Sequence, residues 1–189
     1  MRFVLVALLL VLAGCSTGTD AVEDGTEFQF VSPGGKAELT YDGDDRQPVP
    51  PMSGEDLMSE GEQIAVSDFE DEVVVLNLWG AWCPPCRVEA PELEKVYEEK
   101  KSAGVVVLGI NVRDYDRTAP QDFVRDTGLT YPSIWDPPGR SLLNLKGYPR
   151  SVVPSTIVLD KRHRVAAVFL RDVLAEDLVP VIDRLLAEK

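Results

Sequence analysis

Two long apolar runs with a helical pattern between them are the strongest features of this sequence. Residues 73–79 (VVVLNLW) and 105–112 (VVVLGINV) are nearly continuous apolar segments, the pattern of strands that are buried on both faces. Between them, residues 84–101 carry an apolar stripe at helical spacing, with glutamates near the start, lysines at the end and Gly104 as a stop. That pattern predicts a helix. The order strand–helix–strand indicates a parallel pair of strands.

The C-terminal half continues the alternation of helices and strands. A predicted capping box at 118–121 opens a helix that ends at Gly128. The remaining predicted elements are a weaker strand at 129–135, a short helix at 140–145, a strand pair at 155–159 and 165–170, and an amphipathic closing helix at 174–187. This order predicts an α/β fold with a central mixed β-sheet flanked by helices.

The segment before the first long strand has weaker patterns. Residues 27–31 and 37–41 alternate apolar and polar side chains around a Ser-Pro-Gly-Gly-Lys turn, which predicts a β-hairpin. An acidic, proline-rich connection follows, and a second, weaker hairpin is predicted within 54–66. We therefore expect an added N-terminal hairpin and connection over 27–49, followed by the main domain over 50–189.

The first residues of the chain are typical of an export signal. A positively charged start is followed by the apolar run 3–12 and by L-A-G-C, which ends at Cys15. The run is shorter than the roughly 20 apolar residues of a membrane span, and small residues before Cys15 are typical of a cleavage site. This ending is similar to a bacterial lipoprotein signal, which implies a signal peptide over 1–14, a lipid on Cys15 and a flexible tether over 15–26. An ordinary secretory peptide with a coincidental cysteine is the alternative.

Composition narrows the class of partner. With 44% apolar and 27% charged residues the chain has the composition of an ordinary globular protein. Its formal net charge of -13 argues against nucleic acid, or an anionic membrane surface, as the main partner. We expect this acidity to lie on solvated helix faces, and a docking patch for a basic partner is the alternative.

A Cys-x-x-Cys motif lies where the first long strand meets its helix. Cys83 and Cys86 stand in the sequence W-C-P-P-C. At a helix N-terminus, unpaired N–H groups and the positive end of the helix dipole favour a thiolate. If Cys15 carries a lipid, the other two of the three cysteines form a pair in an oxidising compartment. The pattern predicts a redox-active pair.

Two other roles for this pair fit the sequence less well. A permanent disulfide staple usually closes a longer loop, where the gain in stability is larger. A zinc site needs a second pair of ligands, and the chain offers only His163 once Cys15 is assigned to the anchor. We therefore expect no metal and no cofactor.

The order of elements, with W-C-P-P-C at the first strand–helix junction, resembles a thioredoxin fold. More narrowly, LNLWGAWCPPCRVEAPEL resembles the membrane-anchored thiol-disulfide oxidoreductases of the TlpA/ResA-like group, and the similarity runs from about Pro50 to the C-terminus. Pro91, inside the active-site helix, supports it. So does the sequence VVPST before a strand, which makes Pro154 the candidate cis-proline. Glu89, three residues after Cys86, matches an acidic residue that the cytochrome-maturation members keep beside the site.

These features give each residue of the site an expected role. Cys83, at the exposed start of the helix, is expected to be the attacking thiol, and Cys86, one turn further, the resolving thiol. The resemblance implies that Glu89 is a general acid/base, and an ordinary surface residue is the alternative. Asn77 stands where cytoplasmic thioredoxins carry a buried acid, so proton transfer would pass to Glu89 or to water. The residues expected to contact the substrate are Trp82, Pro84, Pro85, Val153 and Pro154.

The two prolines between the cysteines bear on the stability of the thiolate. Pro84 and Pro85 have no backbone N–H, so the N–H groups of Cys86 and Arg87 remain as donors to the Cys83 thiolate, and the Arg87 side chain adds positive charge. This predicts a less stabilised thiolate, and a more reducing couple, than a motif whose middle residues donate.

Together these features predict an extracytoplasmic, lipid-anchored thiol-disulfide oxidoreductase. The resemblance implies a reductant of client proteins such as apocytochrome c, supplied with electrons by a membrane thiol donor. An oxidant that introduces disulfides into exported proteins is the alternative within this class. A thiol peroxidase normally has a Thr or Ser shortly before its cysteine, and none stands there before Cys83. A non-catalytic lipoprotein that uses the fold to bind a partner is the alternative from a different class.

Overall fold

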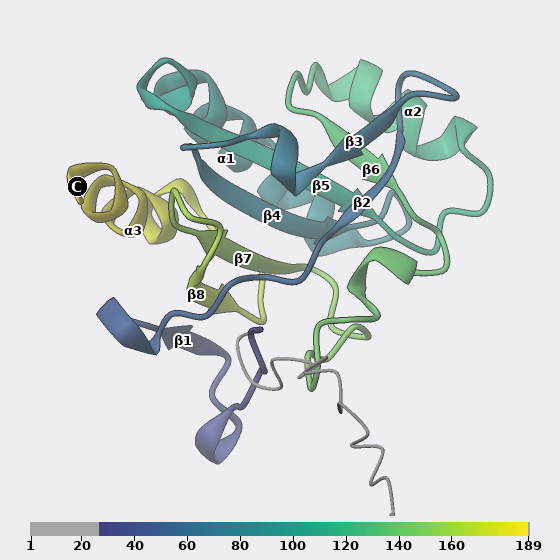
Figure 1. The fold of residues 1–189 in the computed structure, drawn as a ribbon. Helices are drawn as coiled ribbons and strands as arrows, with labels where there is room; N and C mark the ends of the chain where they lie inside the picture. The colour runs from purple at the N-terminus through teal and green to yellow at the C-terminus, as the bar shows by residue number, and fades with distance from the viewer. Residues whose placement is uncertain (1–26, 189) are drawn as a thin grey trace, which may run out of the picture.

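The computed structural model describes residues 27–188, and within that range a mixed sheet of eight strands forms the centre of the fold (Figure 1). The strand order is β1-β8-β7-β4-β5-β6-β2-β3. The strands are β1 (Glu38–Thr40), β2 (Ser53–Asp56), β3 (Gln63–Ala65), β4 (Val73–Trp79), β5 (Val105–Asn111), β6 (Ser133–Trp135), β7 (Ser155–Leu159) and β8 (Val165–Phe169). The helices are α1 (Pro84–Lys100), α2 (Thr118–Thr127) and α3 (Ala175–Ala187). The predicted signal peptide, the predicted lipidation site at Cys15 and the predicted tether lie outside the described residues.

Strand β4 occupies the middle of the sheet because nearly all of its side chains are apolar. It pairs parallel with β5 and antiparallel with β7, and all of its residues are buried. The predicted run 73–79 matches it at both ends. The mixed sheet flanked by helices is therefore confirmed, as is the predicted second hairpin, which β2 and β3 form.

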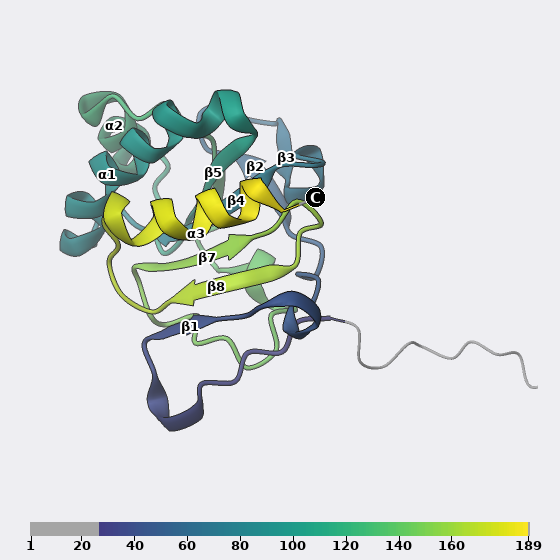
Figure 2. The same ribbon diagram turned by 90° about the vertical axis from the view of Figure 1, so that its left-hand side faces the viewer.

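The helices α1, α2 and α3 lie together on one face of the sheet (Figure 2). Val75 of β4 joins Leu93 of α1, Phe123 of α2 and Ile182 of α3 in one buried cluster. The intervening side chains of β4 point to the opposite face, where the N-terminal segment and the connection before β7 cover them. In the part of the chain described, no helix has the length and apolar character to cross a membrane.

The predicted N-terminal hairpin over 27–41 is wrong. Strand β1 pairs antiparallel with β8, with Leu39 opposite Val168, so it extends the edge of the main sheet. The preceding segment makes only an isolated bridge, between Gln29 and Lys146. Phe28 and Phe30 of this segment are buried in the core, which explains why apolar and polar residues alternate there although the segment forms no hairpin. Strand β1 pairs with the edge of β8 and not with the segment before it, because an unpaired edge would leave backbone groups of β8 without partners.

A buried arginine holds the N-terminal segment to the end of the chain. Arg46 is 4% exposed, and its Nη1 lies 3.3 Å from Asp160 Oδ2. The same guanidinium donates two hydrogen bonds to the carboxylate of Glu188, at 2.6 and 2.8 Å. Paired charges of this kind satisfy a guanidinium that burial would otherwise destabilise. Residues 27–49 are thus packed against the main sheet.

Helix boundaries differ from the prediction in detail. Thr118 is the first residue of α2 and not its cap, because Asp116 Oδ1 accepts the Thr118 N–H at 2.9 Å; the predicted capping box is therefore wrong. The helix ends at Gly128 in the left-handed conformation, with φ 69°, as predicted. The short helix expected at 140–145 is a 3-10 turn over Arg140–Leu142.

Candidate active site

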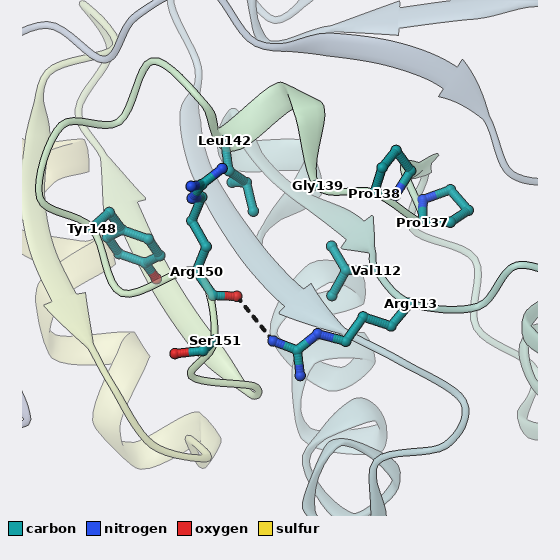
Figure 3. Close-up of a pocket in the computed structure, with 9 residues that line it drawn as sticks. All are labelled: Val112, Arg113, Pro137, Pro138, Gly139, Leu142, Tyr148, Arg150 and Ser151. Atoms are coloured by element: carbon teal, nitrogen blue, oxygen red, sulfur yellow. Dashed lines mark hydrogen bonds between the residues drawn. The ribbon is translucent and has the colours of Figure 1, made fainter.

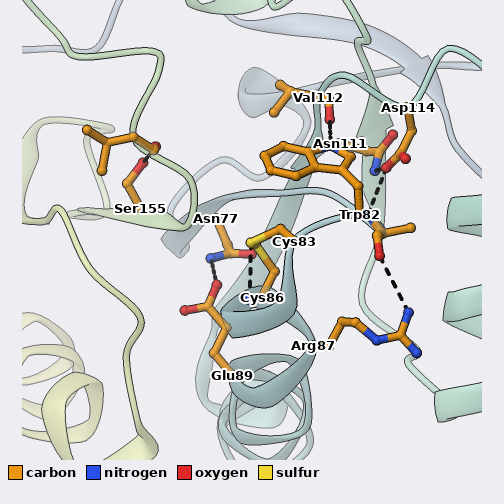
Figure 4. The surroundings of a disulfide bond; sticks show 12 residues. Asn77, Trp82, Cys83, Cys86, Arg87, Glu89, Asn111, Val112, Asp114 and Ser155 are labelled. Atoms are coloured by element: carbon orange, nitrogen blue, oxygen red, sulfur yellow. Dashed lines mark hydrogen bonds between the residues drawn. A yellow bond between two sulfur atoms is a disulfide. The ribbon is translucent and has the colours of Figure 1, made fainter.

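The two cysteines lie at the start of α1 and are joined as a disulfide (Figure 4). Cys83 immediately precedes the first helical residue, and its Sγ accepts a hydrogen bond from the N–H of Cys86 at 3.3 Å. Their Cα atoms are 5.3 Å apart, within the range that a disulfide bridges. The end of β4 thus delivers Cys83 to a helix N-terminus, where a thiolate is favoured.

Both cysteines are buried, so the expectation that Cys83 is exposed is wrong for the disulfide form. Cys83 and Cys86 are each 1% exposed, and Val153 packs against the core cluster that contains them. The two prolines between them are exposed, and Trp82 is 44% exposed. The start of α1 reaches the surface, whereas the side chain of Cys83, its N-cap residue, is buried.

Arg87 was expected to stabilise the Cys83 sulfur through its backbone N–H and its charge, but both groups make other contacts. Its N–H donates to the carbonyl of Cys83 at 3.3 Å. Its guanidinium lies 5.0 Å above the ring of Phe123 and donates to the carbonyl of Ala81 at 3.4 Å. The N–H of Cys86 is therefore the backbone donor to Cys83 Sγ among the described residues.

Glu89 is buried beneath the disulfide, one turn further along α1 (Figure 4). It is 1% exposed, so the alternative that it is a surface residue is wrong. Its Oε1 accepts a hydrogen bond from Asn77 Nδ2 at 2.8 Å, and its Oε2 accepts one from the N–H of Val173 at 3.0 Å. Asn77 Nδ2 also donates to Thr156 Oγ1 at 3.1 Å. Asn77 therefore fixes the position of the carboxyl group.

Burial raises the pKa of Glu89 from 4.5 to about 7, because the charged form loses its hydration. The hydrogen bonds from Asn77 and Val173 act in the opposite direction, since they stabilise the carboxylate. A carboxyl group with a pKa near neutrality can both accept and return a proton under physiological conditions. The general acid/base role of Glu89 stays a prediction, and this pKa is suited to it.

Asn77→Ala is expected to raise the pKa of Glu89 above its value in the wild-type protein. The substitution removes a hydrogen bond that stabilises the charged carboxylate. The pKa is to be measured by ¹³C NMR titration of the glutamate carboxyl groups. Asn111→Ala is the matched control: Asn111 is equally buried, on the neighbouring strand β5, but bonds to Asp114. An unchanged pKa in Asn77→Ala would show that Asn77 does not control Glu89.

The turn before Cys83 is anchored by hydrogen bonds that the sequence alone did not identify. Asp114 Oδ2 accepts the N–H of Ala81 at 2.8 Å and the Asn111 side chain at 2.7 Å. Trp82 Nε1 donates to the carbonyl of Val112 at 3.0 Å. Gly80 is required here, because a Cβ would lie 2.3 Å from the indole nitrogen of Trp82. The only signal in the sequence was an aspartate shortly after a buried strand.

The loop before β7 has the geometry that its sequence indicated. The Val153–Pro154 peptide bond is cis, and Pro154 is buried while Val153 is half-buried. Ser155 Oγ accepts from Tyr148 Oη at 2.7 Å and donates to the carbonyl of Val152 at 3.0 Å. Within residues 27–188, neither the N–H nor the C=O of Val153 takes part in a backbone hydrogen bond. Its backbone is available to pair with an extended segment of another chain.

The described residues do not gather ligands for a metal ion. Across residues 27–188, no three side chains of His, Cys, Asp or Glu are grouped closely enough to hold one. His163 lies in the turn between β7 and β8, and its Nε2 is 3.0 Å from the carbonyl of Phe69.

The sequence that forms this site matches a known protein family. Residues 46–168, which contain both cysteines, Glu89 and Pro154, match the AhpC/TSA family. The chain is 33% identical over 147 residues to the thiol:disulfide interchange protein DsbE of Pseudomonas aeruginosa, an alignment that covers 75% of this chain and 77% of that protein.

Two further similarities concern a second relative and a solved structure. The chain is 36% identical over 114 residues to the thiol-disulfide oxidoreductase ResA of Halalkalibacterium halodurans; the alignment covers 60% of this chain and 61% of ResA. The chain thus spans about three fifths of that relative's length. The crystal structure of a secreted thiol-disulfide isomerase from Corynebacterium glutamicum superposes with a TM-score of 0.84 and 55% identity, over 87% of this chain and 100% of that one. The thioredoxin-like fold and the resemblance to thiol-disulfide oxidoreductases are confirmed.

Proposed function

This chain belongs to the AhpC/TSA family, and from that premise we propose that it is an extracytoplasmic thiol-disulfide oxidoreductase that reduces disulfides in client proteins. One arrangement carries the proposal. A Cys83–Cys86 disulfide at a helix N-terminus stands one turn from a buried carboxyl group, Glu89, with a pKa of about 7. The two relatives described above are named as a thiol-disulfide oxidoreductase and a thiol:disulfide interchange protein.

The proposed cycle begins with both cysteines reduced. The Cys83 thiolate attacks one sulfur of a client disulfide, which forms a Cys83–client disulfide and releases the first client thiolate. The Cys86 thiol passes its proton to the Glu89 carboxylate and attacks Cys83 Sγ. This step forms the Cys83–Cys86 disulfide and releases the second client thiolate. The two client thiolates take up protons, and two electrons have passed to the client. An external dithiol must then reduce the enzyme.

The surface around Cys83 supports binding of an extended client segment. Trp82, Pro84 and Pro85 are exposed around the helix start, and the Val153 backbone and Pro154 lie on the loop before β7. Backbone pairing with Val153 would align the client chain. In the disulfide form Cys83 is buried, so the dithiol that reduces the enzyme would make its first contact with these exposed residues.

The reduction potential of the Cys83–Cys86 pair tests the direction of electron flow. Tryptophan fluorescence in graded thiol buffers gives this potential. A value near or below about -250 mV supports a reductant, whereas a value near about -120 mV identifies an oxidant that introduces disulfides. Absence of a two-electron transition would instead leave a non-catalytic binding protein.

Pro84→His is expected to make the potential less negative by at least about 30 mV. A residue with an N–H at position 84 adds a backbone donor beside the Cys83 thiolate, where the N–H of Cys86 is the donor among the described residues. A stabilised thiolate favours the reduced form. The potential is measured in the same thiol buffers, with Val88→His, an exposed substitution on α1 after the motif, as the control. A potential unchanged within error would contradict this account of the two prolines.

The proposed location is outside the cytoplasm, with a lipid anchor on Cys15. The export-type N-terminus supports both, and the 55% identical Corynebacterium glutamicum protein, which is described as secreted, supports the location. An anchored reductant would receive electrons from a membrane thiol protein and act on clients such as apocytochrome c. Cys15→Ser is expected to move the protein from the membrane fraction to the soluble fraction. Retention of the variant in the membrane would overturn lipid anchoring at this residue.

A further inference from the structure

A cleft of about 520 Å³ lies beside the candidate active site (Figure 3). One wall is the segment directly after β5, with Val112 and Arg113; the opposite wall is Arg150, on the loop that leads to the cis-proline. Leu142 and Tyr148 provide apolar surface between them. The volume is in the range of ordinary ligand pockets, which runs from about 300 to about 1,000 Å³.

The cleft is joined directly to the residues around Cys83. Trp82 Nε1 donates to the carbonyl of Val112, at 3.0 Å. The Arg113 guanidinium lies 5.4 Å from the centre of the Trp82 ring, a cation–π distance. Arg113 Nη2 also donates to the carbonyl of Arg150 at 3.3 Å (Figure 3). A client segment that contacts Trp82 is therefore within reach of both arginines.

The backbone at Arg113 is held in an unusual conformation. Its φ is 62°, in the left-handed region that residues with a Cβ rarely adopt. The Arg113 N–H donates to the carbonyl of Pro137 at 2.9 Å, which fixes the turn. Such conformations persist where the surrounding structure enforces them, and they are concentrated at binding and active sites. Here the conformation directs the arginine over Trp82 and across the cleft.

The cleft is cationic although the chain as a whole is acidic. None of the residues that line it is acidic, while the chain carries a net charge of -13. Among the ion pairs of residues 27–188, none involves Arg113 or Arg150. Two guanidinium groups without carboxylate partners, on opposite walls of one cleft, complement a negative group from outside the protein.

We infer that this cleft binds a carboxylate side chain that the client carries next to its reactive cysteine. The inference rests on the proposed function and adds a client class: disulfides flanked by aspartate or glutamate. The client chain would lie along Val153, with its acidic side chain between Arg113 and Arg150 and its cysteine at Cys83.

The test compares two peptides of equal length that share an internal disulfide and differ by Glu or Gln next to a cysteine. The reduced protein is expected to react with the Glu peptide with a kcat/KM about fivefold higher than with the Gln peptide. This is the effect that an ion pair between exposed charges typically has. This ratio falls in Arg113→Gln and in Arg150→Gln, and approaches one in the double variant. Raising the salt from about 0.01 M to about 1 M should also abolish it.

Arg162→Gln is the matched control. Arg162 is an exposed arginine in the turn between β7 and β8, at the other end of β7 from the cis-proline, and no ion pair of the described residues involves it. Its substitution makes the same change in charge and leaves the ratio at the wild-type value. Because the ratio is taken within each variant, a general loss of activity cancels.

Two outcomes separate this inference from the proposed function. If the wild-type protein reduces both peptides at equal rates, the acidic client class is wrong and the oxidoreductase activity stands. If it reduces neither peptide and shows no two-electron transition, the proposed function itself fails. A preference that persists in the double variant, or that Arg162→Gln abolishes, also overturns the assignment to this cleft.

Discussion

Replacing Cys86 with alanine is expected to leave the protein covalently joined to its client through Cys83, with turnover lowered by on the order of 10³-fold or more. In the wild-type protein, Cys86 lies within bonding distance of Cys83 at the start of α1. Such an intramolecular thiol acts at an effective concentration on the order of 10⁵ M or above. Without Cys86, the mixed disulfide is resolved only by a thiol from solution, in a slower bimolecular reaction.

The mixed disulfide is to be measured by mass spectrometry under non-reducing conditions, after the reduced variant is mixed with a client that contains a disulfide. Cys83→Ala is the control and is expected to trap no client, because Cys86, inside the first turn of α1, is the resolving and not the attacking thiol. The opposite pattern, with trapping by Cys83→Ala alone, would reverse the roles assigned to the two sulfurs.

Glu89→Gln is expected to lower turnover by about 10²-fold, the lower end of the usual contribution of a positioned general acid/base. Glutamine has nearly the shape of glutamate but cannot accept the Cys86 proton. The pH–rate profile should also lose its transition near pH 7, since the pKa of Glu89 is about 7. Turnover of a disulfide client between pH 5 and 9 would be followed. A wild-type profile in the variant would remove Glu89 from the mechanism.

The same substitution should change how stability depends on pH. The folded-state pKa of Glu89 is raised from 4.5 to about 7. Its contribution to stability is therefore present in full below about pH 4.5 and is lost as the pH rises through about 7. The shift corresponds to about 3 kcal/mol. Relative to the wild-type protein, Glu89→Gln should gain about that much free energy of unfolding between pH 4.5 and 8, measured by urea denaturation.

Glu92→Gln is the control for both measurements. Glu92 lies one turn further along α1 and accepts the N–H of Ala175 at 3.3 Å, much as Glu89 accepts that of Val173. It is less buried than Glu89 and lies a turn further from Cys86. The control should keep the wild-type turnover and pH profile. If it lost turnover as strongly as Glu89→Gln, the effect would belong to the contact between α1 and the segment before α3.

The sequence predicted those parts of the protein that local pattern controls. The apolar run 73–79 became β4 with its predicted ends, and the pattern after Pro84 became α1. The two cysteines three positions apart formed the disulfide. Each of these depends on neighbours in the chain: burial of a continuous apolar strand, helical spacing, and the reach between two side chains on one turn. The cis bond at Pro154 was inferred from a resemblance, since X-Pro sequences alone do not select it.

Other features depended on which distant segments came together. Residues 27–41 had the pattern of a hairpin, but β8 offered a free edge and the core took the two phenylalanines. The burial of Cys83 and Glu89 could not be read from a helix whose start is exposed, because the loop before β7 and the segment before α3 cover them. The cleft between Arg113 and Arg150 likewise joins residues far apart in the chain. Local pattern thus determined the strand, the helix and the sulfur pair, whereas their solvent exposure, the pKa of Glu89 and the charge beside them were decided by tertiary packing, since burial and electrostatic interaction depend on distance in space and not on separation along the chain.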